Sequence, residues 1–282
     1  MRMRMKLTRK KPPTLKWSGW TDCGKIRPNN EDSFLGLQFD AKEAYRLGKT
    51  GGALLEKMDF VFAVSDGMGG ALAGEFASRI AVEKITTLLP RAFRYSALGF
   101  QPGFSDVLAE LFDRIHRALV FVGGSYEETA GMQATLSLCW FTPGWMYFGH
   151  IGDSRIYHLP KRKKTMRQIT HDDTYVGWLL RNGKISDYEA RTHPRRNLLQ
   201  KALGGSNQFV DPQAGAIACE RGDVFLLCTD GLVEGLADRQ MVEVLRESQT
   251  SKNISNPAQL LVETAVKNSG RDNTTALVVQ VA

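Results

Sequence analysis

The sequence predicts a single α+β domain in which short buried strands are interspersed with amphipathic helices. Three observations lead to this fold class. Several short apolar runs have strand composition, other segments repeat apolar residues near a 3.6-residue period, and neither an internal repeat nor a composition break follows residue 17. With 282 residues, of which 43% are hydrophobic and 24% charged, the chain can bury a sizeable core.

Strands are expected where β-branched and aromatic residues run together. In order, these runs are residues 16–23, 33–39, 60–64, 135–141, 145–151, 155–159, 224–228 and 274–281. The segment 24–32 contains Pro28 and two asparagines, which favours a loop. Residues 40–57 are polar and dotted with glycine, so they are expected to form a long excursion between two strands.

Helices are expected where apolar residues recur every three or four positions. The segments are residues 71–89, 104–122, 174–182, 186–193, 238–248 and 257–268. Pro90 is expected to end the first of them, because proline has no N–H to donate within a helix. Ser186 followed by Glu189 resembles a capping box.

The net charge of +7 is concentrated at the N-terminus. Residues 1–16 hold seven basic residues and no acidic one, so the remaining chain has 30 basic against 30 acidic residues. This balance argues against a dedicated nucleic-acid-binding domain. The tail is predicted to be disordered and solvated, although contact with anionic lipid, nucleic acid or an acidic partner stays open. The charged run 161–164 is expected to be a solvated hairpin tip.

No apolar run reaches the length of a membrane helix, and no apolar stretch of a signal peptide follows the basic N-terminus. Cys23, Cys139, Cys219 and Cys228 form no C-x-x-C pair. This cysteine usage favours a reducing, cytoplasmic compartment and disfavours a structural zinc site.

One strand-like run, residues 60–64, stops at Asp66 and is followed by Gly67, Gly69 and Gly70. This pattern fits a β-turn with a solvated aspartate, or a ligand for a hard metal ion beside a free carbonyl group. Further carboxylates lie at the ends of strand-like runs: Glu31, Asp32, Asp153, Asp230 and Asp272. Gathered at one edge, they would repel one another unless divalent cations lay among them, and ligation by oxygen alone favours Mg²⁺ or Mn²⁺ over Zn²⁺.

Six motifs carry these residues in order along the chain. They are Arg27-Pro-Asn-Asn-Glu31-Asp32, Val64-Ser-Asp66-Gly67-Met68-Gly-Gly70, Gly131-Met-Gln-Ala-Thr135, Gly149-His-Ile-Gly-Asp153-Ser-Arg155, Cys228-Thr-Asp230-Gly231 and Gly270-Arg-Asp272-Asn273. From about residue 17 to the C-terminus, the sequence resembles the metal-dependent Ser/Thr protein phosphatases of the protein phosphatase 2C (PPM) family in their bacterial form. The resemblance leaves out residues 1–16, so it implies a basic tail over 1–16 and a catalytic domain over 17–282.

The resemblance implies a four-layer α-β-β-α sandwich with two central antiparallel sheets and a dinuclear Mn²⁺ or Mg²⁺ centre at one end. Asp66 matches the ligand that bridges the two ions, and the Gly67 carbonyl group matches a ligand of one of them. Asp230 and Asp272 match the other ligands of that first ion. Asp32 matches a ligand of the second ion, which Glu31 contacts through a water. Asp153 and Asp230 match the ligands of a third, weaker ion of bacterial members.

By the same resemblance, Arg27 holds the substrate phosphate, and residues 171–206 form a mobile flap beside the site. Within the flap, His171, Asp172 and Asp173 depart from the usual bacterial pattern; His171 is read as a surface residue, or as one displaced by a single position into a similar role. Met68 stands where animal members carry a histidine that is proposed as a general acid, so the acid that protonates the leaving group is unassigned.

The predicted function is hydrolysis of phosphoserine and phosphothreonine by direct attack of a metal-activated water, with Arg27 and Asp66 as catalytic residues. Phosphate monoesters need accelerations of up to roughly 10²¹-fold, which two metal ions about 3.5–4 Å apart and an arginine can help supply. The resemblance implies phosphoprotein substrates and an opposing Ser/Thr kinase, and we treat the protein as a monomer without specific nucleic-acid partners. The alternatives are a catalytically weak sensor or adaptor on the same scaffold, and a phosphodiesterase that acts on nucleic acid.

Overall fold

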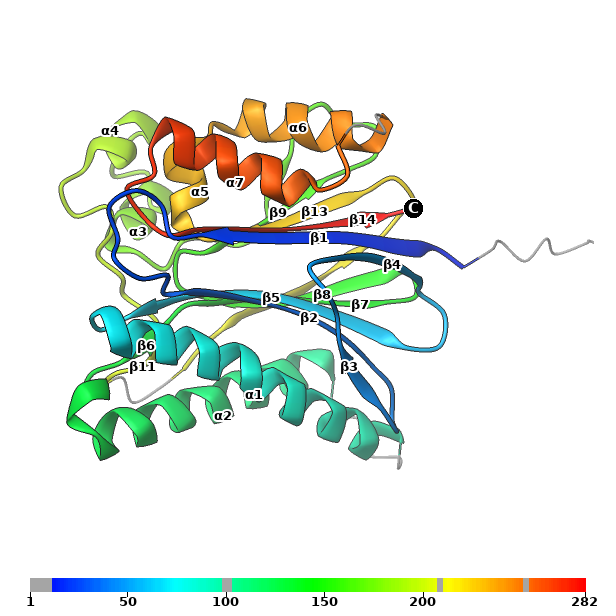
Figure 1. Ribbon diagram of the computed structural model, residues 1–282, viewed down its shortest axis with the longest axis horizontal. Helices are drawn as coiled ribbons and strands as arrows, with labels where there is room; N and C mark the ends of the chain where they lie inside the picture. Colours follow the sequence, from blue (N-terminus) through cyan, green and yellow to red (C-terminus); the bar gives the residue numbers. More distant parts are fainter. Residues whose placement is uncertain (1–11, 98–102, 207–209, 251–253) are drawn as a thin grey trace, which may run out of the picture.

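Two antiparallel sheets lie face to face at the centre of the protein, and helices cover the outer face of each (Figure 1). This computed structural model describes residues 12–97, 103–206, 210–250 and 254–282. The order of layers is therefore helix, sheet, sheet, helix, which confirms the predicted fold class.

The first sheet contains the first and the last strand of the described chain, β1 and β14. Within the described ranges it has six strands in the order β10-β9-β13-β14-β1-β4, and α5, α6 and α7 cover it (Figure 1). Its elements are β1 (Thr14–Asp22), β4 (Thr50–Leu54), β9 (Arg155–Leu159), β10 (Arg167–Gln168), β13 (Val224–Cys228), β14 (Thr274–Val281), α5 (Asp230–Gly235), α6 (Asp238–Thr250) and α7 (Pro257–Asn268).

The second sheet follows the order β11-β6-β5-β7-β8-β12, with β2 paired to β5 and to β3. The helices α1 and α2 cover its outer face (Figure 1). Its elements are β2 (Asp32–Phe39), β3 (Ala44–Arg46), β5 (Asp59–Met68), β6 (Gln133–Ala134), β7 (Leu136–Thr142), β8 (Trp145–Ile151), β11 (Leu203–Gly204), β12 (Gln213–Ala218), α1 (Ala71–Ala97), α2 (Phe104–Ser125) and the short 3₁₀ helix η1 (Glu127–Thr129).

Three apolar clusters fill the spaces between the layers. One packs α1 and α2 on the second sheet around Phe112, and another packs α6 and α7 on the first sheet around Leu261. The third lies between the sheets, where Phe62, Phe141 and Phe225 meet. Burial of apolar surface on both faces of each sheet explains why the central strands read as nearly continuous apolar runs.

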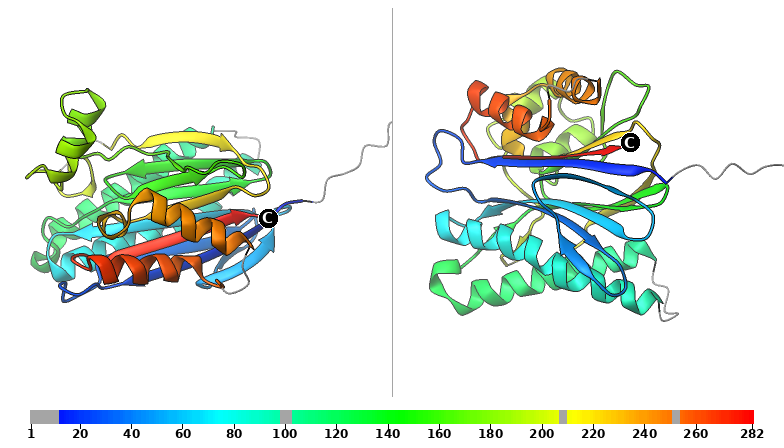
Figure 2. Two further views of the ribbon diagram at one scale, coloured as in Figure 1. Left: turned by 90° about the horizontal axis from the view of Figure 1, so that it is seen from above. Right: turned by 45° about the vertical axis from the view of Figure 1, so that its right-hand side comes forward.

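The predicted flap contains α3 (Tyr175–Arg181) and α4 (Asp187–Thr192), which stand out at the end of the molecule opposite the C-terminus (Figure 2). Thr174 caps α3 by accepting a hydrogen bond from the Gly177 amide group. The capping box of Ser186 and Glu189 at the start of α4 is confirmed.

Several predicted boundaries were wrong. The helix α1 does not end at Pro90 but continues to Ala97, because buried Leu89 and Pro90 hold it on the sheet despite the lost backbone hydrogen bond. The excursion over 40–57 contains strands β3 and β4, which pair with β2 and β1 at the sheet edges. Pairing at an edge, rather than residue preference, makes these polar segments extended. The edge strand β12 and the short helix α5 were also not predicted.

Residues 14–16 of the predicted tail belong to strand β1, which starts at Thr14 and pairs with both β14 and β4. Leu15 is completely buried in the cluster between the sheets. The prediction of a disordered tail otherwise falls on residues 1–11, which lie outside the described residues.

All four cysteines lie within the described ranges, and each is a free thiol. In those same ranges no helix is both long enough and apolar enough to cross a membrane.

Candidate metal centre

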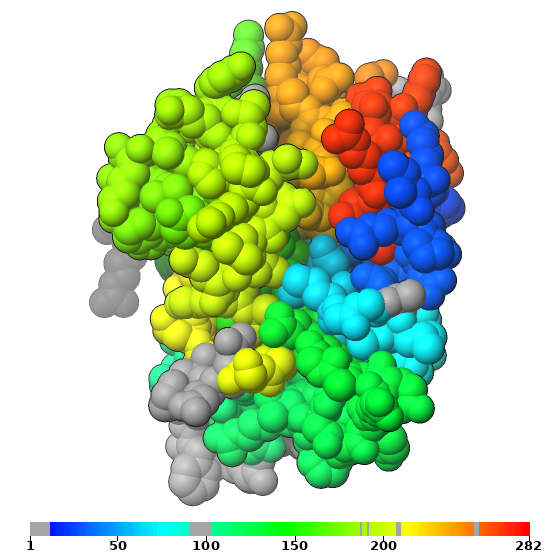
Figure 3. Space-filling view, turned by 90° about the vertical axis from the view of Figure 1, so that its left-hand side faces the viewer, coloured from blue at the N-terminus to red at the C-terminus, as the bar shows by residue number. Residues whose placement is uncertain are grey.

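Strand register brings the predicted carboxylates to one end of the sandwich. Asp32 pairs directly with Asp66 across β2 and β5. On the other sheet, Cys228 pairs with Ala276 and with Arg155 in antiparallel register. Asp230 after β13, Asp272 before β14 and Asp153 before β9 therefore all lie at the same end of this sheet. Figure 3 faces this end, where the N-terminal segment in blue, the start of α1 in cyan and the C-terminal segment in red meet beside the yellow-green flap.

Asp32 joins the two sheets. Its side chain is 7% exposed, and its Oδ2 accepts a hydrogen bond of 2.7 Å from the Thr229 hydroxyl group of the opposite sheet. Among the described residues, its Oδ1 has no hydrogen-bond partner, and the same holds for Oδ1 of Asp230. A buried carboxylate oxygen without a donor is costly, so both atoms are suited to a cation.

The backbone around Asp66 is fixed by Thr135. The Thr135 hydroxyl group accepts a hydrogen bond from the Asp66 amide group at 3.0 Å, and the Thr135 amide group donates to the Asp66 carbonyl oxygen at 2.8 Å. The same hydroxyl group lies 2.7 Å from Oγ of Ser154, the residue after Asp153. The two aspartates are thus tied to one hydrogen-bonded unit.

Two glycines leave space for Glu31 and for the Gly67 carbonyl group. A Cβ atom on Gly67 would lie 1.8 Å from the Gly74 carbonyl oxygen, so no other residue fits there. A Cβ atom on Gly74 would lie 2.8 Å from the Gly67 carbonyl oxygen and 2.9 Å from Oε2 of Glu31. These two predicted ligand oxygens therefore face the same small space, which is open because residue 74 has no side chain.

Burial and mutual repulsion raise the pKa values of the clustered carboxyl groups. Burial is the larger cause in each case, and it raises the pKa of Asp32 to about 7 and that of Asp153 to about 7. The pKa of Asp66 is raised well above its usual value, first by burial and then by the charges of Asp32 and Asp230. Such repulsion is relieved when a cation lies between the carboxylates.

The pKa values of Asp230 and Glu31 respond to the same causes. The pKa of Asp230 is raised well above its usual value by burial and then by Asp153 and Asp272. Burial also raises the pKa of Glu31, although the nearby Arg27 charge opposes the shift. Acids from five separate chain segments therefore act on one another electrostatically.

Arg27 lies at the rim of the carboxylate group. Its Nη2 donates a hydrogen bond of 2.8 Å to Oδ2 of Asp272, and its side chain is 47% exposed. Hydrogen bonding to Asp272 is the main cause that raises the pKa of Arg27. A guanidinium group has five N–H donors, so donors remain for an anion from solvent.

Asn273 is a site residue whose role the sequence did not reveal. Its Oδ1 accepts a hydrogen bond from the Glu31 amide group, and its Nδ2 donates to the carbonyl oxygens of Cys23 and Asn29. It thereby holds the loop that carries Arg27. The one signal in the sequence is its place directly after Asp272.

The flap aspartates are fully engaged in hydrogen bonds. Asp172 accepts bidentate hydrogen bonds from the Arg155 guanidinium group, including one of 2.6 Å. Asp173 is 7% exposed and accepts from the Gly152 amide group and from Nε2 of Gln213, both at 3.1 Å. These contacts attach the flap to the turn that carries Asp153.

The nearby histidines and serines have structural roles. His171 is exposed, and its backbone pairs with the Gln213 side chain. His150 is buried, and its two ring nitrogens contact Ser137 and the Gly152 carbonyl oxygen. Ser65 donates a hydrogen bond to the Thr135 carbonyl oxygen. Ser137 and His150 form a serine–histidine pair, but both residues are 0% exposed, so the pair is out of reach of a substrate.

Across the described ranges, no group of three or more His, Cys, Asp or Glu side chains is gathered closely enough to hold a metal ion. The residues present are still suited to a metal ion, because a buried side-chain oxygen of Asp32 and one of Asp230 lack donors and the space at Gly74 is open. The donor set consists of oxygen atoms, the ligands that Mg²⁺ and Mn²⁺ prefer.

Comparison with known proteins decides the family. The sequence model of the family described as Protein phosphatase 2C matches residues 50–263. The chain belongs to the protein phosphatase 2C family. The predicted resemblance is thereby confirmed over most of the chain.

Two curated relatives of this family are named as phosphatases. The chain is 32% identical over 270 residues to the serine/threonine protein phosphatase PstP of Mycobacterium tuberculosis, covering 95% of this chain and 45% of PstP. It therefore spans less than half the length of that relative. It is 33% identical over 261 residues to the serine/threonine phosphatase stp of Listeria innocua, covering 92% of this chain and 93% of stp.

Solved structures of the family share the fold. The serine/threonine phosphatase of S. agalactiae superposes with a TM-score of 0.78 at 26% identity, covering 95% of this chain and 100% of that one. The catalytic domain of PstP in complex with 2 manganese ions superposes with a TM-score of 0.70 at 29% identity, covering 96% and 99%.

Proposed function

We propose that this protein is a metal-dependent phosphatase that hydrolyses phosphoserine and phosphothreonine in proteins. The observation that carries the proposal is the convergence of carboxylates from separate segments, two of them with buried oxygens that lack donors. Relatives of the family that are named serine/threonine phosphatases support this substrate class.

The ligand set that we propose follows the strand ends. Asp66 would bridge two divalent cations, and the Gly67 carbonyl group, Asp230 and Asp272 would complete the shell of one. Asp32 would hold the other, with Glu31 acting through a water, and Asp153 with Asp230 would hold a third, weaker ion. We propose Mn²⁺ or Mg²⁺, because every donor is an oxygen atom and a related catalytic domain binds manganese.

Two divalent ions held there would supply an activated water for direct attack on phosphorus and would offset charge in the transition state. Arg27 would orient the phosphate dianion through the N–H donors that Asp272 leaves free. Asn273 would keep Arg27 in place by holding its loop. Asp172 and Asp173 would act on the flap and not on the substrate, because their oxygens already accept hydrogen bonds from the protein.

The cellular setting belongs to the same proposal. We place the protein in the cytoplasm as a monomer that opposes a Ser/Thr kinase, because its four free cysteines suit a reducing compartment. Phosphorylated proteins would be its partners.

Turnover of p-nitrophenyl phosphate and of a phosphothreonine peptide tests the proposal. We expect hydrolysis with Mn²⁺, none with EDTA, and loss of activity in an Asp66→Ala variant. Asp211→Ala is the matched control, because Asp211 is 86% exposed and has not been placed in the site. Activity that survives chelation would contradict the proposal, and background hydrolysis at saturating Mn²⁺ would support the sensor or adaptor alternative.

A further inference from the structure

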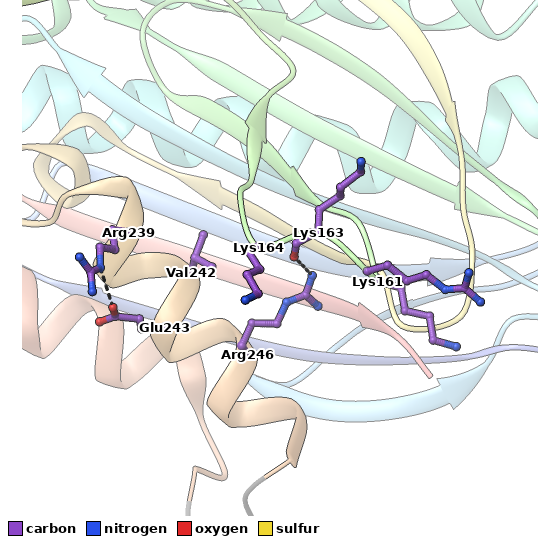
Figure 4. A pocket seen from close by; sticks show the side chains of 8 residues that line it. Lys161, Lys163, Lys164, Arg239, Val242, Glu243 and Arg246 are labelled. Atoms are coloured by element: carbon purple, nitrogen blue, oxygen red, sulfur yellow. Dashed lines mark hydrogen bonds and ion pairs between the residues drawn. The ribbon is translucent and has the colours of Figure 1, made fainter.

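A basic hollow lies between α6 and the turn that joins β9 to β10. Its volume is about 420 Å³, and its lining holds six basic side chains, one carboxylate and Val242. Figure 4 shows Lys164 and Arg246 directed into the space from its two walls. We refer to the space lined by Lys161, Arg162, Lys163, Lys164, Arg239 and Arg246 as the basic hollow.

The basic hollow is separate from the carboxylate end. Strand β9 begins at Arg155, beside Asp153, and runs away from it to Leu159, so the turn after β9 lies at the other end of the sheet. Figure 1 shows α6 and the end of β9 toward the side of the molecule that bears the C-terminus. The predicted metal ligands take no part in its lining.

The turn that carries four of the cations is held rigidly. Nη2 of Arg246 donates hydrogen bonds to the carbonyl oxygens of Pro160 and Lys163, and the Lys163 amide group closes the turn on Pro160 at 3.0 Å. On its other side, Oδ1 of Asp223 accepts from the Lys161 amide group at 2.9 Å. These contacts use the backbone of the turn and leave its side chains exposed to solvent.

The charge of the hollow is left unbalanced. Glu243 is its one carboxylate, and this group is paired with Nε of Arg239 at 3.0 Å. Asp223 is 4% exposed beneath the turn, where it accepts hydrogen bonds from backbone amide groups and lies 3.2 Å from Nε2 of His158. Its charge acts on Arg246. Within the described residues, no ion pair engages the side chains of residues 161–164. Such a concentration of one sign attracts anions from solution.

The shape of the hollow favours a peptide over other polyanions. A nucleic acid strand binds along an extended basic groove with aromatic side chains on which bases stack, and the hollow has no aromatic lining. A membrane offers a broad plane, whereas this space lies between the turn after β9 and α6 and is lined by cations from both. A short chain with adjacent carboxylates or phosphates can enter it and meet lysines and arginines on both sides.

We propose that the basic hollow is a docking site for an acidic segment of a partner protein, in which Asp, Glu or phosphorylated side chains are adjacent. The site is separate from the phosphatase centre and goes beyond the activity proposed for it. A partner held there would be retained without occupying the catalytic end.

Binding of a fluorescein-labelled hexaglutamate peptide tests the proposal by fluorescence anisotropy. The measurement is made in EDTA at low ionic strength, so it does not depend on catalysis. We compare the wild type with the double variant Lys161→Gln and Lys164→Gln, in which glutamine keeps the aliphatic stems and removes two charges. The matched control is Lys57→Gln with Lys84→Gln, two exposed lysines that do not line the hollow.

We expect the hollow variant to bind the peptide about fivefold more weakly or worse, and the control to change by less than about twofold. Reversal of the same charges, Lys161→Glu with Lys164→Glu, should weaken binding further, and about 1 M salt should abolish it. Turnover of p-nitrophenyl phosphate with Mn²⁺ should be the same in all these variants, so failure of the phosphatase proposal would be recognised separately.

Equal weakening in the hollow and control variants would overturn the proposal, as would the absence of peptide binding to the wild type. Phosphatidylglycerol vesicles and single-stranded oligothymidine form the competing arms. If either binds more tightly than the peptide and loses affinity in the hollow variant, the occupant is a membrane or a nucleic acid, and the acidic-peptide proposal is wrong.

Discussion

Two groups of aspartates lie next to each other at the carboxylate end and differ in their partners. The first group is Asp32, Asp66, Asp153 and Asp230, the proposed metal ligands whose pKa values are raised by burial. Within it, Asp32 and Asp230 each have a buried oxygen without a donor among the described residues. In the second, Asp172 accepts hydrogen bonds from Arg155, and Asp173 accepts from Gly152 and Gln213.

The difference distinguishes carboxylates that are available to bind an ion from carboxylates that stabilise the fold. A carboxylate whose acceptors are filled by protein donors stabilises the fold and has little left to offer an ion. A buried carboxylate with empty acceptors destabilises the protein until a cation binds. Hence substitutions in the first group should lower activity without lowering the stability of the metal-free protein, and those in the second should lower stability.

The largest effect is expected for Asp66→Asn. Loss of the charge that would bridge two ions should lower Mn²⁺-dependent kcat/KM by about 10³-fold or more, equivalent to several kcal/mol. In EDTA at pH 8 the variant should melt at a higher temperature than the wild type, because one of the mutually repelling charges is gone. A lower melting temperature in EDTA together with wild-type activity would show that Asp66 stabilises the fold and does not bind the ions.

Arg27→Lys should lower kcat/KM for a phosphopeptide by about 10- to 100-fold, mainly through KM. Lysine keeps the charge but cannot contact Asp272 and a phosphate through one planar group, and charge-assisted hydrogen bonds contribute about 1.5–3 kcal/mol. Steady-state kinetics provide the measurement. Arg114→Lys, in an exposed pair with Glu110, is the control and should stay within about twofold. An unchanged KM in Arg27→Lys would remove Arg27 from phosphate binding.

Asp173→Ala should destabilise the protein by about 1–3 kcal/mol, because the Gly152 amide group and the Gln213 side chain lose their acceptor. For a domain of this size that is a fall in Tm of about 2–10 °C. Thermal unfolding should show the fall with and without Mn²⁺. Asp211→Ala, at an exposed ion pair, should shift Tm by less than about 2 °C. A fall seen only with Mn²⁺ would assign Asp173 to the first group.

The smallest effect concerns pH. Burial raises the pKa of Asp32 from 3.8 to about 7, so folding of the metal-free protein favours the protonated carboxyl group. The stability that this group contributes is present in full below its unfolded pKa and is lost as pH rises toward and through about 7. Because Mn²⁺ competes with protons for the carboxylates, the rise in Tm that Mn²⁺ causes should grow with pH. A rise that does not depend on pH would contradict this assignment.

The residues of the carboxylate end were easier to predict from the sequence than the residues that hold them in place. Asp66, Asp230 and Asp272 could be found because each follows or precedes an apolar run and lies beside glycine or asparagine. Because each of these residues lies near or just beyond the end of a strand, antiparallel pairing of the strands gathers them at one end of the sandwich. The prediction that the helix ends at Pro90 was wrong, because it rested on local hydrogen bonding alone. Packing of α1 against the sheet keeps the helix continuous through Pro90.

The stabilising roles of Asp173 and Asn273 could not be predicted, because the partners of these residues are distant in sequence. Asp173 accepts a hydrogen bond from Gln213, which is 40 residues away in sequence, and Asn273 donates one to the Cys23 carbonyl oxygen, which is 250 residues away. The charged run at 161–164 was predicted as a solvated tip, and its side chains are indeed exposed. Only the fold places α6 with Arg239 and Arg246 opposite it.

Calorimetric titration of the metal-free protein with Mn²⁺ at pH 7, in two buffers of different ionisation enthalpy, tests the central claim most directly. The claim is that the first group of carboxylates exists to hold divalent ions. It predicts saturable binding with release of protons, because Asp32 and Asp153 have pKa values of about 7 and must ionise fully to bind. It also predicts that Asp66→Asn loses this binding while Asp211→Ala keeps it. No saturable binding to the wild type, or equal binding to Asp66→Asn, would contradict the claim.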